Sequence, residues 1–225
     1  MINNSLSFLI KCNLTTQVWL FNCPEGCQNT LVQNQIKIHQ INNIILTSLE
    51  IDNISGIMGL LSSLSLSCRV QQVNIFGPPG IFQYLQLARK YSQTTFRYSL
   101  KIHIIHYGYL TINKHYLLYA NPNDPYKHTF TYILLESEKI GRFQLYKAHN
   151  IYKLQAGPIY GQLKNHKRLI MPDGSIISGK YFTHQPTMGL KILYLKNLRA
   201  IRLSAEMLCK LTQLIYKNIN EIYEL

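Results

Sequence analysis

Residues 45–61 read ILTSLEIDNISGIMGLL: an apolar, strand-like start, a short polar turn and an apolar, helix-like end. A loop that follows a strand is a common place for catalytic groups. The carboxylates of Glu50 and Asp52 are therefore candidates for metal binding or for general-base chemistry. The same residues also fit an ordinary helix start, in which Asp52 is the N-cap or an acid of the first turn. On these residues alone, the helix start is the favoured interpretation.

Strand-like and helix-like segments alternate on both sides of this stretch. Short apolar and β-branched runs predict strands over 5–12, 18–21, 41–46, 73–76, 101–106, 115–120, 129–135 and 191–195. Helix-like patterns predict helices over 54–66, 81–91, 140–154 and 208–222. Residues 157–161, GPIYG, are typical of a turn-rich loop. Strands mixed with helices indicate a layered α/β or α+β fold.

Several short segments carry a more specific signal, because they resemble one family in the same order and at similar spacing. The opening stretch resembles THLHGDHxxGLPGLL of ribonuclease Z, the zinc-dependent endonuclease that trims the 3′ end of precursor tRNA. Residues 75–80, IFGPPG, resemble its IYGPPG. Further resemblances are 19–28 (WLFNCPEGCQ) to WLFDCGEGTQ, 128–129 to the HT of HTVP, 157–164 (GPIYGQLK) to GPLYGKLK, and 191–197 (KILYLKN) to the YxGDT strand end.

The resemblance implies the metallo-β-lactamase fold, an αβ/βα sandwich, with residues 1–225 as a single domain. Relative to the family, the sequence begins after the first strand and ends before the late histidine segment. We therefore expect a sandwich that is incomplete at both ends. Residues of about 139–182 correspond to the flexible arm with which the family grips the tRNA body.

The family holds two zinc ions with histidine and aspartate side chains, and most of those positions carry other residues here. The substituted ligand positions are Ser48, Glu50, Asn53 and Asn197. Asp52 and His128 keep the family's residue types, and Glu50 is a third candidate ligand. Asp52 also stands at the family's proposed proton acceptor, which makes it the candidate catalytic residue.

A protein zinc site usually has four ligands, or three and a water. With two or three donors left, we expect no resident cofactor, or at most one weakly bound zinc or manganese ion. A two-metal clamp on a phosphodiester is not expected. The family is one of hydrolases. The sequence leaves open whether this chain is an enzyme, and the replaced ligands favour a chain without catalytic activity.

The chain is strongly basic, with 23 Lys and Arg against 10 Asp and Glu and a formal net charge of +13. Such a surface attracts polyanions. The arm segment interleaves basic and aromatic side chains, which suit phosphates and base stacking, although a generally basic surface explains the charges equally well. The glycines and the Gly-Pro turn match more specifically. The tRNA-binding candidates are Gly157, Pro158, Tyr160, Gly161, Lys164, Lys167 and Arg168.

The leading hypothesis is a non-catalytic protein that binds tRNA or precursor tRNA as a homodimer, or as a heterodimer with an intact ribonuclease Z. The first alternative is an active endoribonuclease that removes 3′ trailers with a reduced metal site. The second alternative is a vestigial protein or a protein-interaction module without an RNA role.

No window approaches the roughly 20 apolar residues of a membrane-spanning helix, so no membrane partner is expected. The first residues resemble neither a secretory signal nor a transit peptide. Five scattered cysteines predict a reducing compartment and no disulfide framework, with Cys12, Cys23 and Cys27 as buried small hydrophobic residues. The usage of Asn, Ile, Lys and Tyr is typical of AT-rich genomes. It favours an organelle-encoded protein of the plastid (chloroplast), with the cytoplasm as the alternative.

Overall fold

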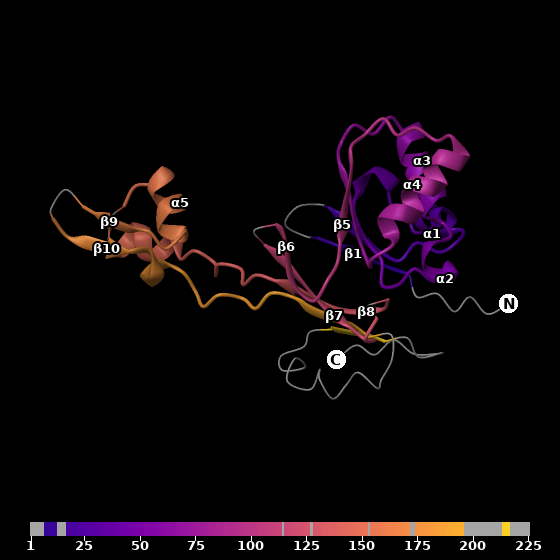
Figure 1. Cartoon of the computed structure of the whole chain (residues 1–225). Coiled ribbons are helices and arrows are strands. Elements are labelled where there is room, and N and C mark those ends of the chain that lie inside the picture. The colour runs from indigo at the N-terminus through magenta and orange to yellow at the C-terminus, as the bar shows by residue number, and fades with distance from the viewer. Residues whose placement is uncertain are drawn as a thin grey trace.

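The protein was analysed as a computed structural model, which describes residues 7–12, 17–113, 115–126, 128–152, 154–171, 174–195 and 213–216. These residues form two five-stranded sheets and one two-stranded sheet. The two large sheets make the body of the molecule, and the small sheet lies at the end of a long arm (Figure 1). Within these ranges, every helix is too short or too polar to cross a bilayer.

The first sheet has the strand order β1-β2-β3-β4-β5; β1 and β2 are antiparallel and the other pairs are parallel. Its strands are β1 (Phe8–Lys11), β2 (Val18–Phe21), β3 (Ile41–Ile45), β4 (Val73–Gly77) and β5 (Leu100–Ile104). The central strands β2, β3 and β4 are almost wholly buried. Burial on both faces explains why they read as nearly continuous apolar runs.

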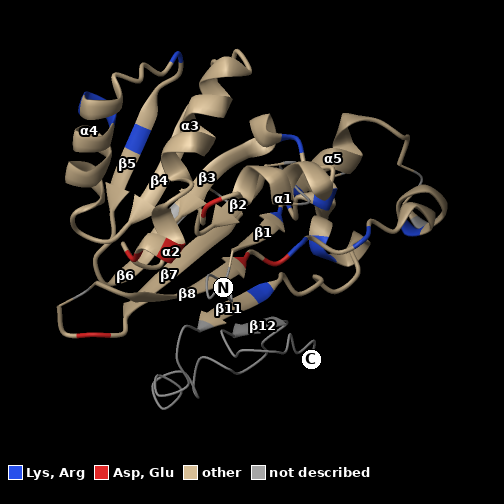
Figure 2. Cartoon of the chain, turned by 90° about the vertical axis from the view of Figure 1, so that its right-hand side faces the viewer, with Lys and Arg blue, Asp and Glu red and all other residues tan. Residues whose placement is uncertain are grey.

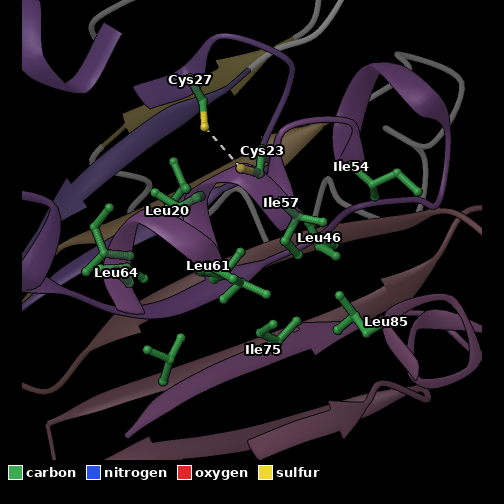
Figure 3. Packing of buried hydrophobic residues seen from close by; sticks show 14 of the residues in the cluster. Leu20, Cys23, Cys27, Leu46, Ile54, Ile57, Leu61, Leu64, Ile75 and Leu85 are labelled. Atoms are coloured by element: carbon green, nitrogen blue, oxygen red, sulfur yellow. Dashed lines mark hydrogen bonds between the residues drawn. The ribbon is translucent and has the colours of Figure 1, made fainter. Parts of the chain in front are cut away.

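Helices cover one face of this sheet (Figure 2). They are α1 (Cys27–Gln33), α2 (Ile51–Ile54), α3 (Ile57–Leu66) and α4 (Ile81–Ser92), with the short 3-10 helix η1 (Ile38–Gln40) before β3. Helix α3 buries Ile57, Leu60, Leu61 and Leu64, whose spacing of three and four places them on one side. They pack against strand residues such as Ile75 (Figure 3). Each such fully buried side chain stabilises the fold by roughly 1.5–3 kcal/mol.

The second sheet packs against the other face of the first. Its order is β12-β11-β8-β7-β6, built from β6 (Gly108–Asn113), β7 (Tyr116–Pro122), β8 (Phe130–Glu136), β11 (Lys191–Leu195) and β12 (Gln213–Tyr216). Trp19 and Phe21 of the first sheet meet Tyr116 and Tyr132 of the second in one buried cluster. The Trp19 and Tyr116 rings lie edge to face with centroids 5.3 Å apart. The body is thus layered helix, sheet, sheet.

The arm lies between β8 and β11. Its two sides are extended and meet at the antiparallel bridges between Lys139 and Thr187 and between Phe143 and Thr183. The tip contains the π-helix η2 (Lys147–Ile151), α5 (Pro158–Lys164), β9 (Arg168–Ile170), β10 (Ile176–Ser178) and the 3-10 helix η3 (Gly179–Phe182). It has its own small core of Ala148, Leu154, Leu163, Ile177 and Phe182. The tip therefore packs on itself, well away from the body (Figure 1).

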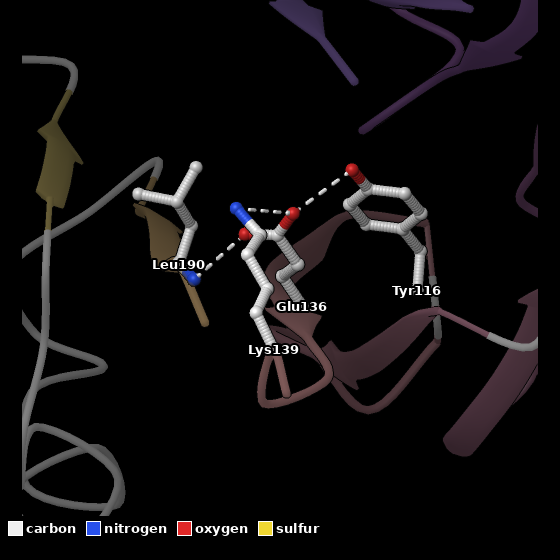
Figure 4. A network of polar contacts seen from close by, with 4 residues as sticks. All are labelled: Tyr116, Glu136, Lys139 and Leu190. Atoms are coloured by element: carbon white, nitrogen blue, oxygen red, sulfur yellow. Dashed lines mark hydrogen bonds and ion pairs between the residues drawn. The ribbon is translucent and has the colours of Figure 1, made fainter. Parts of the chain in front are cut away.

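A buried carboxylate joins the two sides of the arm at its base (Figure 4). Glu136 accepts hydrogen bonds from the Tyr116 hydroxyl and the Leu190 N–H, each at 3.1 Å. Its side chain, 1% exposed, also pairs with the Lys139 ammonium at 3.1 Å. Burial alone would raise the pKa of Glu136, but these three donors outweigh it and hold that pKa below its ordinary value. The base of the arm is thus fixed by a charged group.

Most predicted strands and the helices over 54–66 and 81–91 are confirmed, as are the buried positions of Cys12, Cys23 and Cys27. The helix predicted over 140–154 is wrong: only a short helix from 147 to 151 forms, because the preceding residues pair with the other side of the arm. The predicted loop over 157–161 is helical, since Pro158 occupies the first turn of α5.

The helix predicted over 208–222 is also wrong where the structure describes it. Residues 213–216 form β12, which pairs in parallel with β11, so a sheet neighbour overrides the helical spacing. The rest of that segment lies outside the described residues. Helix α1 and strands β6, β9 and β10 were not predicted.

Candidate functional site

The turn after β3 and the loop between β7 and β8 meet at one edge of the body. Ser48 and Thr129 form an isolated antiparallel bridge. The N–H of Phe130, the first residue of β8, donates to the Thr47 carbonyl at 2.8 Å. These contacts bring the backbone at His128 close to the turn that carries Glu50 and Asp52.

Neutral polar side chains fill the centre of this region. Asn22, directly after β2, accepts hydrogen bonds at 2.9 Å from both the N–H and the hydroxyl of Thr47. Both residues are fully buried. Burial raises the pKa of Tyr194, while hydrogen bonds with Thr47 and Asn22 act against the rise. Asn22 after β2, Thr47 after β3 and Tyr194 of β11 thus interact with one another, and all three are uncharged. The charge of the Glu50 carboxylate also raises the pKa of Tyr194.

A second neutral pair occupies two of the substituted ligand positions. The side-chain amide of Asn53 donates to the Ser48 hydroxyl at 2.6 Å, and both residues are buried. The N–H of Glu50 also points at that hydroxyl, with a longer separation of 3.4 Å. A buried hydroxyl and amide need such partners, because each costs free energy when it is left unsatisfied. The pair therefore stabilises the turn itself.

The charged candidates lie outside this buried centre. Glu50 is the N-cap of α2 without a side-chain cap, and Asp52 is in its first turn, which confirms the interpretation of Asp52 as a first-turn acid. Glu50, Asp52 and His128 are all exposed. Among the described residues, no three His, Cys, Asp or Glu side chains are arranged to hold a metal ion. Asn197 lies outside the described residues.

Asp124 organises the loop that carries His128. One carboxylate oxygen accepts from the His128 N–H at 2.9 Å; the other accepts from the N–H and the hydroxyl of Thr129 at 3.1 and 3.0 Å. The His128 ring stacks on Tyr126, with centroids 6.1 Å apart. Sequence reasoning missed Asp124, although an Asp-Pro pair is typical of the start of a turn.

The pH dependence of this loop follows from Asp124. Partial burial works against ionisation, but the hydrogen bonds from His128 and Thr129 outweigh it and lower the pKa of Asp124. A lowered carboxyl pKa stabilises the fold above the unfolded value, and that stabilisation is lost as pH falls through the folded pKa. We expect the Thr129 amide NMR signal to titrate below the ordinary carboxyl range and not to titrate in Asp124→Asn. Titration at the ordinary carboxyl value would contradict the hydrogen-bonded loop.

The proposed tRNA-binding residues gather at the tip of the arm. Lys164 ends α5, Lys167 follows it, Arg168 begins β9, and all three side chains are exposed. From residue 139 to 190 the only acidic residue in the sequence is Asp173. Blue cationic segments mark the arm in Figure 2. The tip therefore presents positive charge with little to neutralise it.

The other predicted arm residues differ in what they do. Tyr160 is part of the tip's packing: its hydroxyl donates to the Leu154 carbonyl at 2.8 Å, and its ring lies 5.3 Å from that of Phe143. Pro158 starts α5. A Cβ at Gly157 or Gly161 would meet no other atom within 4 Å. Packing within the described residues thus does not require glycine at either position.

Comparison with known proteins places the fold and the family. The chain is 35% identical over 203 residues to the uncharacterized protein ycf56 of Porphyra purpurea, covering 90% of this chain and 77% of that protein. It is 35% identical over 191 residues to ribonuclease Z of Acaryochloris marina, covering 85% of this chain and 60% of that enzyme. The chain belongs to the ribonuclease Z family. It spans about 60% of the length of the ribonuclease Z relatives, and no family model matches it.

The solved structures of the family confirm the predicted fold class. Human tRNase Z, short form, superposes with a TM-score of 0.56 at 16% identity, covering 94% of this chain and 85% of that one. A long form RNase Z from yeast gives 0.55 at 14% identity, covering 96% of this chain and 31% of that one. At such identities the likeness concerns the fold alone, which is the metallo-β-lactamase sandwich.

Proposed function

We propose that this ribonuclease Z-like protein binds tRNA or precursor tRNA through its arm and does not cleave it. The observation that carries the proposal is the contrast between the two ends of the molecule. The described part of the arm tip has its own small core and exposed cations. The region where the family binds zinc is filled by neutral side chains that bond to one another.

The arm supports RNA binding by its chemistry and its distance from the body. Exposed lysines and arginines contact phosphates, and exposed aromatic rings stack on unpaired bases. Tyr146, Tyr152 and Tyr181 of the arm are exposed. Because the tip stands far from the body (Figure 1), it can grip RNA without any help from the region around Ser48.

The neutral region supports the loss of cleavage. Hydrolysis by two metals needs several anionic or imidazole ligands around a shared water. Here the Ser48 hydroxyl is engaged by Asn53, and Asn22 is engaged by Thr47. A metal bound by Ser48, Asn53 or Asn22 would require these buried bonds to break. The two exposed acids of the α2 turn are left without an activated water to act on.

The partner and the compartment belong to the same proposal. We infer that the protein acts as a homodimer, or beside an intact ribonuclease Z that supplies the catalytic site. We infer that it acts in the plastid. This is in keeping with an amino-acid usage typical of AT-rich genomes and with the ycf56 name of its relatives from Porphyra purpurea and Pyropia yezoensis.

A second candidate function is cleavage with a reduced metal site. The bridge between Ser48 and Thr129 favours it, because it holds the Asp52 turn near His128. In that case a single zinc or manganese ion on Asp52 and His128, with Glu50 as a third ligand, would activate the attacking water. Asp52→Ala would then abolish cleavage.

One gel experiment separates these functions. Purified protein is incubated with a 3′-extended precursor tRNA, with and without zinc or manganese, and both bound and cleaved RNA are scored. We expect binding that the metals do not change and no cleavage. Cleavage at the 3′ boundary that disappears in Asp52→Ala would establish the reduced-site enzyme instead. Binding that collapses with salt and is no tighter for tRNA than for an unrelated RNA would favour a vestigial or protein-interaction role.

A further inference from the structure

Two thiols face each other between β2 and α1. Cys23 follows β2, and Cys27 is the first residue of α1. Between them Gly26 adopts φ 74°, a left-handed conformation that reverses the chain and that glycine tolerates best. The two Sγ atoms lie 3.0 Å apart and point toward one another (Figure 3). A disulfide bond, at about 2.05 Å, would need the sulfurs to approach by only about 1 Å.

One of the two thiols can be reached from outside. Cys23 is fully buried, whereas Cys27 is 5% exposed. Cys27 also lines a cavity of about 460 Å³, whose wall includes Glu25, Thr30 and Asn34. This volume falls within the range of small-molecule pockets. A small thiol reagent that enters this cavity would therefore meet Cys27 before the fully buried Cys23.

We propose that Cys23 and Cys27 are a thiol–disulfide exchange site that forms a reversible intramolecular disulfide. The Cys27 thiolate attacks one sulfur of an external disulfide, such as glutathione disulfide, forming a mixed disulfide and releasing one thiolate. The Cys23 thiolate then attacks the Cys27 sulfur, displacing the second thiolate. The external disulfide is reduced to two thiols, and the protein pair loses two electrons and two protons.

The environment of the pair supports this order of attack. The hydrogen bond with Cys23 lowers the pKa of the Cys27 thiol, although burial acts in the opposite direction. The same hydrogen bond and burial both raise the pKa of the Cys23 thiol. The more accessible thiol is thus the one that ionises first. Cys68, which is exposed, lies elsewhere and serves as an internal reference for labelling.

The pair is connected to the turn that carries Asp52. The Cys23 N–H donates to the Asn53 carbonyl at 2.7 Å, and the Gly56 N–H donates to the Cys23 carbonyl at 2.9 Å. A Cβ at Gly56 would clash with the Pro24 carbonyl, so this backbone lies directly against the start of α3. Oxidation would therefore stiffen the segment on which α2 rests, whatever the protein binds.

Peptide mapping tests the proposal on the full chain. A Cys12→Ala background removes the other cysteine of the tryptic peptide 12–37, and a protease that cuts after Glu25 then separates Cys23 from Cys27. After incubation with glutathione disulfide, we expect peptides 12–25 and 26–37 to remain linked, two hydrogen atoms lighter than their sum. Reduction should release them. Native Cys12 protein is mapped in parallel by fragmentation, in case the variant folds poorly.

Two matched variants make the result specific. Cys23→Ser should trap glutathione on Cys27 as a lasting mixed disulfide, because the resolving thiol is gone. Cys27→Ser should form no link and take up no glutathione at Cys23, while Cys68 still reacts. The proposal is overturned if peptides 12–25 and 26–37 separate after oxidation, or if glutathione stays on Cys27 of the Cys12→Ala protein while Cys23 is intact.

Discussion

Replacing Lys164, Lys167 and Arg168 together by alanine is expected to weaken the binding of precursor tRNA about 100-fold near 0.1 M salt. The three side chains are exposed where α5 gives way to β9, at the tip of the arm. A cation that neutralises one phosphate contributes a salt slope of about −0.7 to −0.9, which is roughly 5-fold in affinity at this ionic strength. Three lost contacts multiply to about 100-fold.

The salt dependence provides a second, independent measurement. The slope of log K against log[salt] is expected to become less steep by about 2 in the triple variant, because three counterion-releasing contacts are gone. Binding is measured by titration at several salt concentrations. The fold should not change, because none of the three side chains belongs to the core of the tip.

A matched control removes three cations from the body. Lys37, Lys90 and Lys101 are also exposed, and they lie before β3, in α4 and in β5. Their triple alanine variant loses the same charge. If the arm is the binding surface, this control should weaken binding less than 5-fold. Equal losses in both variants would mean that the whole basic surface attracts RNA, as a generally basic surface predicts, and would contradict the arm proposal.

The positions of the candidate site residues could be predicted from the sequence, because they are defined by which residue stands at each position of the family motif. Ser48, Asn53 and Asp52 were located from the sequence by the resemblance of residues 45–61 to the family's ligand-bearing loop, and the strand β3 and the helices α2 and α3 form around that turn. Their contacts were not predictable. The bond between Asn53 and Ser48, and the involvement of Tyr194 with Thr47, depend on how β3, α2 and β11 pack together. Local sequence does not encode such pairings.

The arm shows the same division in its secondary structure. Its charges and glycines could be read directly from the sequence. The helix predicted over 140–154 was wrong, because residues such as Phe143 are extended and pair across the arm with Thr183. Pro158 is compatible with a turn or with the first turn of a helix. The helix α5 forms, and it buries Leu163 in the small core of the tip. Long-range pairing and a small local core thus override local preference.

Replacing Glu136 by alanine is expected to destabilise the protein by about 3 kcal/mol, more than any other single substitution that we propose. The side chain is 1% exposed. Its removal leaves the Tyr116 hydroxyl and the Leu190 N–H without their acceptor at the base of the arm. Breaking a buried, hydrogen-bonded charge by deleting one partner costs about 3–5 kcal/mol, and we take the lower end because Lys139 is one-third exposed on its side chain. Chemical denaturation measures the loss.

Two variants separate the hydrogen bonds from the ion pair. Lys139→Ala deletes only the partly exposed cation and should cost less than about 1 kcal/mol. Glu136→Gln keeps one carbonyl oxygen, which can accept from the Leu190 N–H in place of Oε2, while its amide NH2 would face the Tyr116 hydroxyl. Because it keeps part of the hydrogen bonding and loses the charge, it should fall between the other two. Since the pKa of Glu136 is lowered in the folded state, the difference between native protein and Glu136→Gln should shrink as pH falls through that pKa.

The same variants show whether the arm depends on its base. Gly189 sits where a Cβ would clash with the Glu136 carbonyl, so the two sides of the arm are in close contact at this point. The tip, by contrast, packs on its own residues around Phe182. In the Glu136→Ala variant we therefore expect backbone amide hydrogen exchange to become faster at position 136, at Lys139 and at Leu190, and to stay slow in α5. Faster exchange throughout the tip would mean that the tip folds only when its base is closed.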